Sequence, residues 1–309
     1  MGTAFVFPGQ GSHRPGAGRA WAGGPAAQLL GEVGHAIGRD VAVLLDDPGT
    51  GARTADAQPA IFAASLVAWR ALDMAGVRPD VVAGHSLGEI SAAVASGALS
   101  IHDGSRVVAA RGEAMAHACA RRPGGMAAVL KCGRDAVRLL VEDDAELVVA
   151  NDNAPGQVVV AGTRSAIERL RDRVRSAGGR ALPLDVEGAF HSPAMEPAVG
   201  PLQAALAAAA WRPVAVPLVT ATSGEILEDP DSIATAIAAG MLAPVHWRAV
   251  QQRLVALGIR DLVEVGPGGV LAGLATRTAP DLRVHSVATP ADVTSVAASL
   301  AAAVVGAMR

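Results

Sequence analysis

Runs of hydrophobic residues that end at Gly or Pro alternate, in the first part of the chain, with hydrophobic stripes at helical spacing. The runs at residues 4–7 and 80–84 predict buried strands of the kind found in parallel sheets. The stripe over residues 59–75 predicts a helix, and further helices are expected at 89–96 and 103–120. Strand, tight glycine-flanked turn and helix in this order are typical of an open α/β sheet.

The pattern changes at residue 123 and indicates a smaller unit. The expected elements are strands at 125–130, 147–150, 157–161 and 181–186, and helices at 134–142 and 165–177. The Asn-Asp-Asn-Ala-Pro-Gly segment that follows residue 150 is expected to form the turn between the two middle strands. The order βαββαβ in so short a stretch is that of a ferredoxin-like domain.

The α/β pattern returns after this segment, so the small unit is predicted to be an insertion. The remaining predicted elements are one helix and two strands, at 195–210, 216–220 and 261–265. We therefore expect a large α/β-hydrolase-like domain with a parallel sheet, formed by residues 1–122 and 190–309. The inserted ferredoxin-like domain is expected over residues 123–189.

The composition is that of a globular protein, because 51% of the residues are hydrophobic and 18% are charged. A formal net charge of −3 supplies no general basic field, so we expect no nucleic-acid partner. The two cysteines cannot form a disulfide framework and lack the spacing of metal ligands. The longest uncharged stretch, residues 293–308, is too short to span a membrane and predicts a terminal helix instead. The start of the chain lacks the pattern of a signal peptide, so a cytoplasmic protein with no membrane association is expected.

Residues Gly84-His-Ser-Leu-Gly88 fit the G-x-S-x-G pattern of a nucleophile elbow. A serine hydroxyl attacks well when a sharp turn presents it, and glycines on both sides let the backbone approach closely. The helix that follows points its N-terminal amides at a developing oxyanion. Because the pattern lies between a predicted strand and a predicted helix, Ser86 is predicted to be a nucleophile.

A serine nucleophile needs a base, and the chain contains eight histidines. His85 directly precedes the serine and is expected to project away from it. His285 suits the order of an α/β hydrolase, in which the histidine follows the last strand. His191 comes directly after the inserted unit. Spacing alone leaves both His285 and His191 open.

Five separate segments together resemble the malonyl-CoA:acyl carrier protein transacylases and the acyltransferase domains of polyketide synthases. They are Phe7–Ser12, Gly84–Glu89, Arg111–Met115, Gly188–Pro193 and Glu264–Gly268. Their order and spacing are those of the family, and the match extends from Phe5 to about Ala275. The family also has an inserted ferredoxin-like domain, as the pattern of strands and helices predicts for this chain.

The resemblance implies that Ser86 is the nucleophile and His191 its general base. In the family the histidine is oriented by a backbone carbonyl, from a Gln shortly before a Pro-Val-x-Trp segment. The corresponding position in this chain is Gly240. The backbone amides of Gln10 and Leu87 are implied as the oxyanion hole.

The resemblance also implies the acyl group. Arg111 stands where the family has an arginine that forms a bidentate pair with a free carboxylate, such as a malonyl group carries. Gln58 matches a glutamine that lines the same pocket. Phe190, directly before the histidine, and Leu87 resemble the variant that selects malonyl over methylmalonyl groups.

We therefore expect an acyltransferase that moves a malonyl group from coenzyme A to the phosphopantetheine thiol of an acyl carrier protein, through an acyl ester on serine. His285 is then structural. No metal or redox cofactor is expected, because the coenzyme A thioester is itself the substrate, and the protein is expected to be a monomer. The alternatives are a polyketide-pathway acyltransferase for another acyl group or carrier, an editing acyl hydrolase, and a catalytically idle carrier-protein adaptor. The basic run at residues 168–175 is either a solvated helix face or a docking face for an acidic carrier protein.

Overall fold

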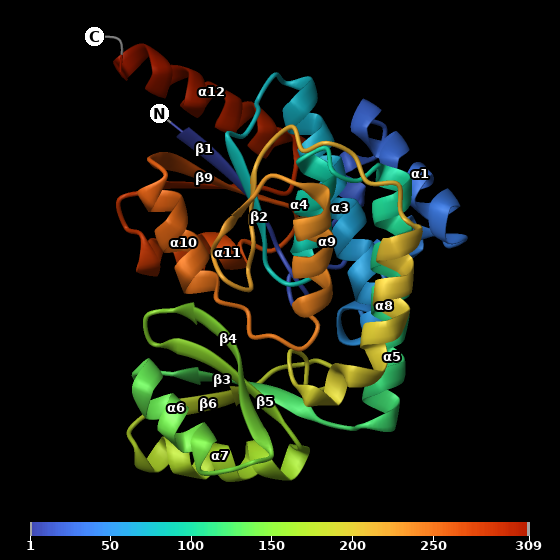
Figure 1. The fold of residues 1–309 in the computed structure, drawn as a ribbon. Coiled ribbons are helices and arrows are strands. Elements are labelled where there is room, and N and C mark those ends of the chain that lie inside the picture. The colour runs from blue at the N-terminus through green and yellow to red at the C-terminus, as the bar shows by residue number, and fades with distance from the viewer. Residues whose placement is uncertain (1, 308–309) are drawn as a thin grey trace.

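A six-stranded sheet forms the centre of the larger part of the molecule (Figure 1). The computed structural model describes residues 2–307. The strands of this sheet are β1 (Gly2–Phe7), β2 (Val81–Gly84), β7 (Leu218–Val219), β8 (Ile226–Leu227), β9 (Ile259–Val265) and β10 (Arg283–Val287). They lie in the order β10-β9-β1-β2-β7-β8, and each neighbouring pair is parallel except β7 and β8. The predicted α/β class with a parallel sheet is confirmed.

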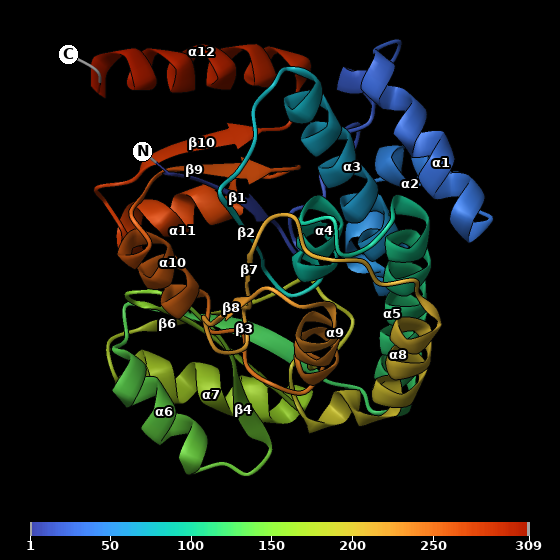
Figure 2. The same ribbon diagram turned by 45° about the horizontal axis from the view of Figure 1, so that its top comes forward.

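Helices cover both faces of this sheet (Figure 2). They are α1 (Gln28–Ile37), α2 (Val41–Asp46), α3 (Thr54–Met74), α4 (Gly88–Ala95), α5 (Ile101–Arg121), α8 (Glu196–Ala208), α9 (Pro230–Ala239), α10 (Trp247–Ala256), α11 (Val270–Thr278) and α12 (Pro290–Ala307), with 3-10 turns at Arg19–Trp21, Pro25–Ala27, Thr50–Ala52 and Pro193–Met195. Successive side chains of a strand point to opposite faces. Phe5 and Phe7 of β1 therefore pack in one core with α3 and α4, whereas Ala4 and Val6 pack in another with α10 and α11.

A four-stranded antiparallel sheet and two helices form a smaller unit, at the bottom of Figure 1. Its elements are β3 (Gly125–Leu130), α6 (Arg134–Glu142), β4 (Leu147–Ala154), β5 (Gln157–Gly162), α7 (Arg164–Ser176) and β6 (Arg180–Pro183). The strand order is β4-β5-β3-β6, and Val129 and Val160 pack with α6 and α7 on one face. Met126, Ala128 and Val159 point to the other face, which lines a cleft toward the large sheet. The predicted βαββαβ order is confirmed.

The turn predicted between β4 and β5 is wrong in length. Residues 151–154 continue β4, and only Pro155 and Gly156 form the turn. The backbone of Asp152 donates to the carbonyl of Val245 at 2.9 Å, and Val245 donates to the carbonyl of Ala150 at 2.8 Å. Asn151 and Asp152 thus pair with β5 on one side and lie beside the distant Val245 on the other, although polar residues in this pattern predict a turn.

Helix α3 begins at Thr54, ahead of the predicted start at Pro59. Pro59 has no N–H group to donate to the carbonyl of Ala55 one turn earlier, which favours placing the proline at the start of a helix. In the structure Nη1 of Arg39 donates to the Ala55 carbonyl at 3.0 Å. Because a side chain from another segment supplies the missing hydrogen bond, the helix continues through the proline.

Several elements had no predicted counterpart, namely α1, α2, β8, α9, α10, α11 and β10. Helix α12 corresponds to the terminal helix predicted at 293–308, of which residue 308 lies outside the described residues. It packs against α3 and β10 (Figure 2). No helix within residues 2–307 is both long and apolar enough to cross a bilayer.

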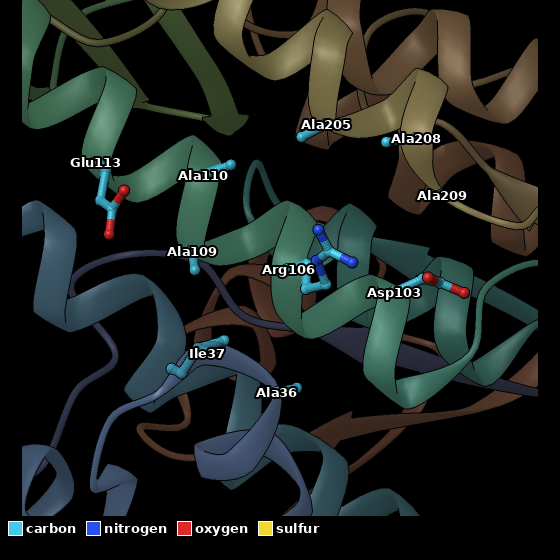
Figure 3. Close-up of a pocket in the computed structure, with 10 residues that line it drawn as sticks. All are labelled: Ala36, Ile37, Asp103, Arg106, Ala109, Ala110, Glu113, Ala205, Ala208 and Ala209. Atoms are coloured by element: carbon cyan, nitrogen blue, oxygen red, sulfur yellow. The ribbon is translucent and has the colours of Figure 1, made fainter.

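A hollow of about 260 Å³ lies between α1, α5 and α8. Alanines form much of its wall, and the charged side chains of Asp103, Arg106 and Glu113 all come from α5 (Figure 3). No predicted site residue, and no serine, cysteine or histidine, is among the ten described residues that line it. The hollow is therefore no candidate for the predicted nucleophilic chemistry.

Candidate active site

Ser86 lies at the tight turn between β2 and α4, at the carboxyl ends of the parallel strands. Its φ of 55° falls in the left-handed region, where a residue with a Cβ is strained. A Cβ at Gly84 would lie 2.0 Å from the carbonyl carbon of Gly88, and a Cβ at Gly88 would lie 2.1 Å from the carbonyl oxygen of Phe7. Both positions therefore require glycine, and the close backbone contacts they allow hold Ser86 on a sharp turn.

His191 follows the small unit in the chain and directs its imidazole at Ser86. Its Nε2 is 2.8 Å from Oγ of Ser86, and its Nδ1 is 2.8 Å from the carbonyl oxygen of Gly240, the residue that ends α9. A carbonyl oxygen only accepts hydrogen bonds, so Nδ1 carries the proton and Nε2 is free to accept from the serine hydroxyl. This tautomer is the one that a general base requires.

The imidazole of His191 is unprotonated at neutral pH. Burial, reinforced by the nearby Arg111 cation, lowers the pKa of His191 to about 3. His285 lies elsewhere, on β10, where its Nε2 is 3.2 Å from Oδ1 of Asp261 on β9. Of the two histidines that spacing leaves open, the structure therefore brings His191 to Ser86.

Arg111 is 4% exposed, and its guanidinium reaches Ser86 from α5. Its Nη2 donates to Oγ of Ser86 at 2.9 Å, and its Nη1 donates to Oε1 of Gln58, on α3, at 2.8 Å. Burial lowers the pKa of Arg111 to about 10, so the side chain remains a cation at neutral pH. Within residues 2–307 no carboxylate forms an ion pair with it. A buried cation of this kind beside a nucleophile is suited to bind an anionic group.

The backbone amides of Gln10 and Leu87 belong to the turns after β1 and β2. Neither amide donates a hydrogen bond to a protein acceptor in the part of the chain that the structure describes. Gln10 and Ser86 line the same cleft, and the Gln10 side chain is held by Thr54, whose Oγ1 lies 3.4 Å from Nε2. Both amides are thus available for an oxygen atom of a bound substrate.

A cleft of about 370 Å³ lies over Ser86, between the large sheet and the antiparallel sheet. Met126 and Val159 line it from the small unit, and Leu271 lines it from α11 of the large one. Phe190, which is 5% exposed, forms the wall beside the base. Both units enclose the nucleophile, which limits the access of water to a reactive intermediate.

Two polar residues of the site were not predicted. Glu89, in the first turn of α4, is 3% exposed, and its Oε1 accepts hydrogen bonds from Oγ1 of Thr220 and N of Ala221, each at 2.8 Å. Asn153 on β4 lies with its Oδ1 2.9 Å from Nε2 of His85, which therefore points to the small unit. Glu89 could have been found, because it is the last residue of the Gly84–Glu89 segment that carries the family resemblance. No local pattern marks Asn153.

The site combines a hydroxyl on a strained turn, a neutral base, two free amides and a buried cation. These are the parts of a covalent acyl-transfer site in which the acyl group carries a negative charge. No three His, Cys, Asp or Glu side chains within residues 2–307 come together as a metal site. Cys119 and Cys132 are buried free thiols.

The basic run on α7 is largely paired with acidic side chains of its own unit. Arg169 contacts Asp144 at 2.8 Å and Glu146 at 2.7 Å, and Arg173 contacts Asp143 at 2.9 Å. Exposed pairs of this kind add little stability, but they cancel much of the charge that an acidic partner would need. The structure therefore favours the solvated helix face over the docking face.

The profile of the family described as "Acyl transferase domain" matches residues 4–309. The malonyl CoA-acyl carrier protein transacylase of Bacillus subtilis (strain 168) is 35% identical over 296 residues, which cover 93% of this chain and 93% of the relative. The crystal structure of an acyl-carrier-protein S-malonyltransferase from Burkholderia pseudomallei 1710b has a TM-score of 0.91 and 36% identity, covering 96% of this chain and 99% of that one. A malonyl-transacylase in complex with its type II PKS acyl-carrier protein has a TM-score of 0.90 and 31% identity, covering 97% and 100%.

Proposed function

The chain belongs to the acyl transferase domain family and is an acyltransferase, and we propose that it moves a malonyl group from coenzyme A to an acyl carrier protein. One observation carries the choice of acyl group. Arg111, buried and without an acidic partner in ion-pair contact among the described residues, touches the Ser86 hydroxyl. An acyl ester on that hydroxyl places its far end near the cation, which favours an acyl group that ends in a carboxylate.

In the first half of the proposed reaction, Ser86 attacks the thioester carbonyl of malonyl-CoA while its proton passes to Nε2 of His191. The Gly240 carbonyl accepts from Nδ1–H and stabilises the imidazolium that forms. The amides of Gln10 and Leu87 donate to the oxyanion of the tetrahedral intermediate. The C–S bond then breaks, the coenzyme A thiolate takes the proton from the imidazolium, and the malonyl group remains as an ester.

In the second half, the phosphopantetheine thiol of the carrier protein gives its proton to His191 and attacks the ester carbonyl. Collapse of this second intermediate loads the carrier, and the imidazolium returns a proton to the oxygen of Ser86. Arg111 holds the malonyl carboxylate throughout, with its guanidinium fixed by Gln58. The enclosed cleft favours the thiol over water, and thus transfer over hydrolysis.

Phe190 supports malonyl as the preferred group. Its ring is buried in the cleft wall next to His191. A bulky ring there leaves less space for the extra methyl of a methylmalonyl group than a small residue would. One such contact discriminates by about 1–3 kcal/mol, so we propose a preference of that size.

We propose that a single chain holds the complete site, since Ser86, His191, Arg111 and Gly240 come from one chain. The solved complex of a similar malonyl-transacylase with its carrier protein supports a carrier as the acceptor. The proposed proton transfers involve Ser86, His191 and the substrate thiols, and they call for no metal or redox cofactor. The cytoplasm, where coenzyme A thioesters and carrier proteins are used together, is the proposed location.

The covalent intermediate provides the direct test. We expect the purified protein, mixed with malonyl-CoA and no carrier, to gain one malonyl group by intact-protein mass spectrometry. Peptide mapping should place the group on Ser86, and addition of a carrier protein with its phosphopantetheine arm should remove it to the carrier. Release of free malonate in place of carrier loading would support the hydrolase alternative, and absence of any adduct would support the adaptor.

Arg111→Ala is expected to reduce the kcat/KM of malonyl transfer about ten- to a hundredfold, because a charge-assisted pair at a buried site contributes about 1.5–3 kcal/mol. Acetyl transfer, which makes no such pair, should hold steady or rise. The ratio of the two kcat/KM values is the measurement, since it cancels any general loss of folded enzyme. Arg111→Lys is the matched control: it keeps the charge without the forked donors and should lose less of the malonyl preference. An equal loss for both substrates would make Arg111 structural.

A further inference from the structure

Glu89 is a buried carboxyl in the active site that takes no part in the proposed steps. Its backbone N–H donates to the carbonyl of Ser86 at 3.0 Å, so it lies one turn from the nucleophile. One carboxyl oxygen, Oε1, accepts from both Thr220 and Ala221. The other oxygen, Oε2, faces Gly240: a Cβ added to Gly240 would lie 3.5 Å from this oxygen. Burying a carboxyl group in this way is costly unless a charge or a hydrogen-bond network compensates for it.

Arg111 is the cation that compensates. It lies on α5, which packs against α4, and both residues contact Ser86: the Arg111 guanidinium donates to the Ser86 hydroxyl, and the Glu89 backbone N–H donates to the Ser86 carbonyl. The cation is thus close enough to attract the buried Glu89 carboxylate without an ion-pair contact between them. The attraction works in both directions, because Glu89 favours the charged form of Arg111 and Arg111 favours the carboxylate of Glu89. Arg111 donates to Ser86 and Gln58 and not to Glu89, so Glu89 does not occupy the side of the guanidinium that faces the nucleophile.

We propose that Glu89 is the counter-charge of Arg111 in the empty site, and that it takes up a proton when the carboxylate of the acyl group binds Arg111. The inference rests on the proposed function, because it concerns an acyl group that ends in a carboxylate. A bound malonyl carboxylate would otherwise put two negative charges beside one cation in a site that excludes water. Protonation of Glu89 removes one of these negative charges. Glu89 is thus a positioning residue that acts through Arg111, because its protonation leaves the cation to pair with the acyl carboxylate.

The surroundings of Glu89 make this proton transfer accessible near neutral pH. Burial raises the pKa of Glu89 to about 7, although the donors Ala221 and Thr220 and the Arg111 cation each lower it. The other titratable groups of the site are His191 and His85, and burial lowers the pKa of both, so neither is charged there. A carboxylate on Arg111 offsets the cation and repels Glu89, and both effects raise the pKa of Glu89 further.

The sign of the pH dependence follows from this coupling. Below pH 7 Glu89 is already largely protonated, so a malonyl group binds without displacing its charge. As the pH rises through 7, binding must be accompanied by proton uptake and becomes weaker. We expect the ratio of kcat/KM for malonyl-CoA to that for acetyl-CoA to fall about fivefold between pH 6 and pH 8, which corresponds to a rise of about one unit in the pKa of Glu89 on binding. Arg111, with a pKa of about 10, stays charged over this range. The ratio cancels the ionisation of coenzyme A itself, which both substrates share.

The experiment measures this ratio across the pH range in the wild type and in two variants. Glu89→Gln keeps an oxygen to accept from Thr220 and Ala221 but cannot ionise, so the ratio should be high and independent of pH between pH 6 and pH 8, where Arg111 stays a cation. Thr220→Val removes one hydrogen bond and no charge, so the fall should persist but move to higher pH, because Thr220 lowers the pKa of Glu89. A ratio that falls between pH 6 and pH 8 in Glu89→Gln would overturn the inference.

The wild type alone also tests the inference, without relying on either variant to fold. A ratio that stays constant from pH 6 to pH 8 in the wild type would overturn it. The malonyl adduct on Ser86 is measured in the same samples. If that adduct forms while the ratio is constant, the role of Glu89 is wrong and the proposed function stands; if no adduct forms, the proposed function itself is wrong.

Discussion

Ser86→Ala is expected to abolish the covalent acyl-enzyme and to reduce transfer by on the order of 10⁴-fold or more, because the proposed ester intermediate forms on this hydroxyl. The Ser86 hydroxyl is the point at which the base and the cation meet, with Nε2 of His191 at 2.8 Å and Nη2 of Arg111 at 2.9 Å. Its removal leaves the free amides and the cleft able to bind substrate but without a nucleophile. The measurement is the yield of malonyl adduct by intact-protein mass spectrometry, together with the rate of carrier loading.

Ser91 offers a matched control for this substitution. It lies on α4, the helix that follows the Ser86 turn, it is fully buried, and its hydroxyl has no hydrogen-bond partner within the described residues. Ser91→Ala removes the same atom five residues further along the chain and should leave adduct formation unchanged. Circular dichroism and thermal unfolding should show both variants folded. Retention of the adduct by Ser86→Ala would contradict the assignment of the nucleophile.

The nucleophile turn was predictable because its causes are local. Gly84 and Gly88 flank Ser86 within five residues, and the steric demand for glycine at both positions follows from the turn itself. The contact between His191 and Ser86 was not predictable from spacing, since the two residues are 105 positions apart and the whole small unit lies between them in the chain. The resemblance to a family pointed to His191 where the order of residues also allowed His285.

The elements that the sequence misplaced depend on partners far away in the chain. Arg39 donates to the Ala55 carbonyl that Pro59 leaves without a partner. Helix α3 therefore runs through Pro59, whereas the local preference of proline predicts that the helix begins there. Val245 pairs with β4, so polar residues lie in a strand where a local rule expects a turn. The electrostatic link between Glu89 and Arg111 has the same character, because two helices must pack before either side chain acts on the other.

His191→Ala is expected to reduce the rate of acyl transfer by at least ~100-fold, as general acid–base catalysis typically contributes that much or more. The wild-type imidazole accepts from Ser86 and stays neutral because burial lowers its pKa to about 3. Without it, the Ser86 hydroxyl keeps, among the described residues, only Arg111 as a side-chain partner, and a cation cannot accept the serine proton. Both half-reactions should slow, so the measurement is the rate of adduct formation and the rate of its transfer to a carrier, followed separately by rapid quench.

His285→Ala is the control that tests which of the two histidines left open by spacing, His191 or His285, is the base. His285 pairs with Asp261 on the neighbouring strand, and Asp261 also has a 2.6 Å contact with Arg283 that the substitution does not touch. The variant should therefore lose little activity and at most a small part of its stability. A large loss of activity in His285→Ala together with a small loss in His191→Ala would mean that His285 is the base. The proposed mechanism, which rests on the contacts among Ser86, His191 and Gly240, would then be wrong.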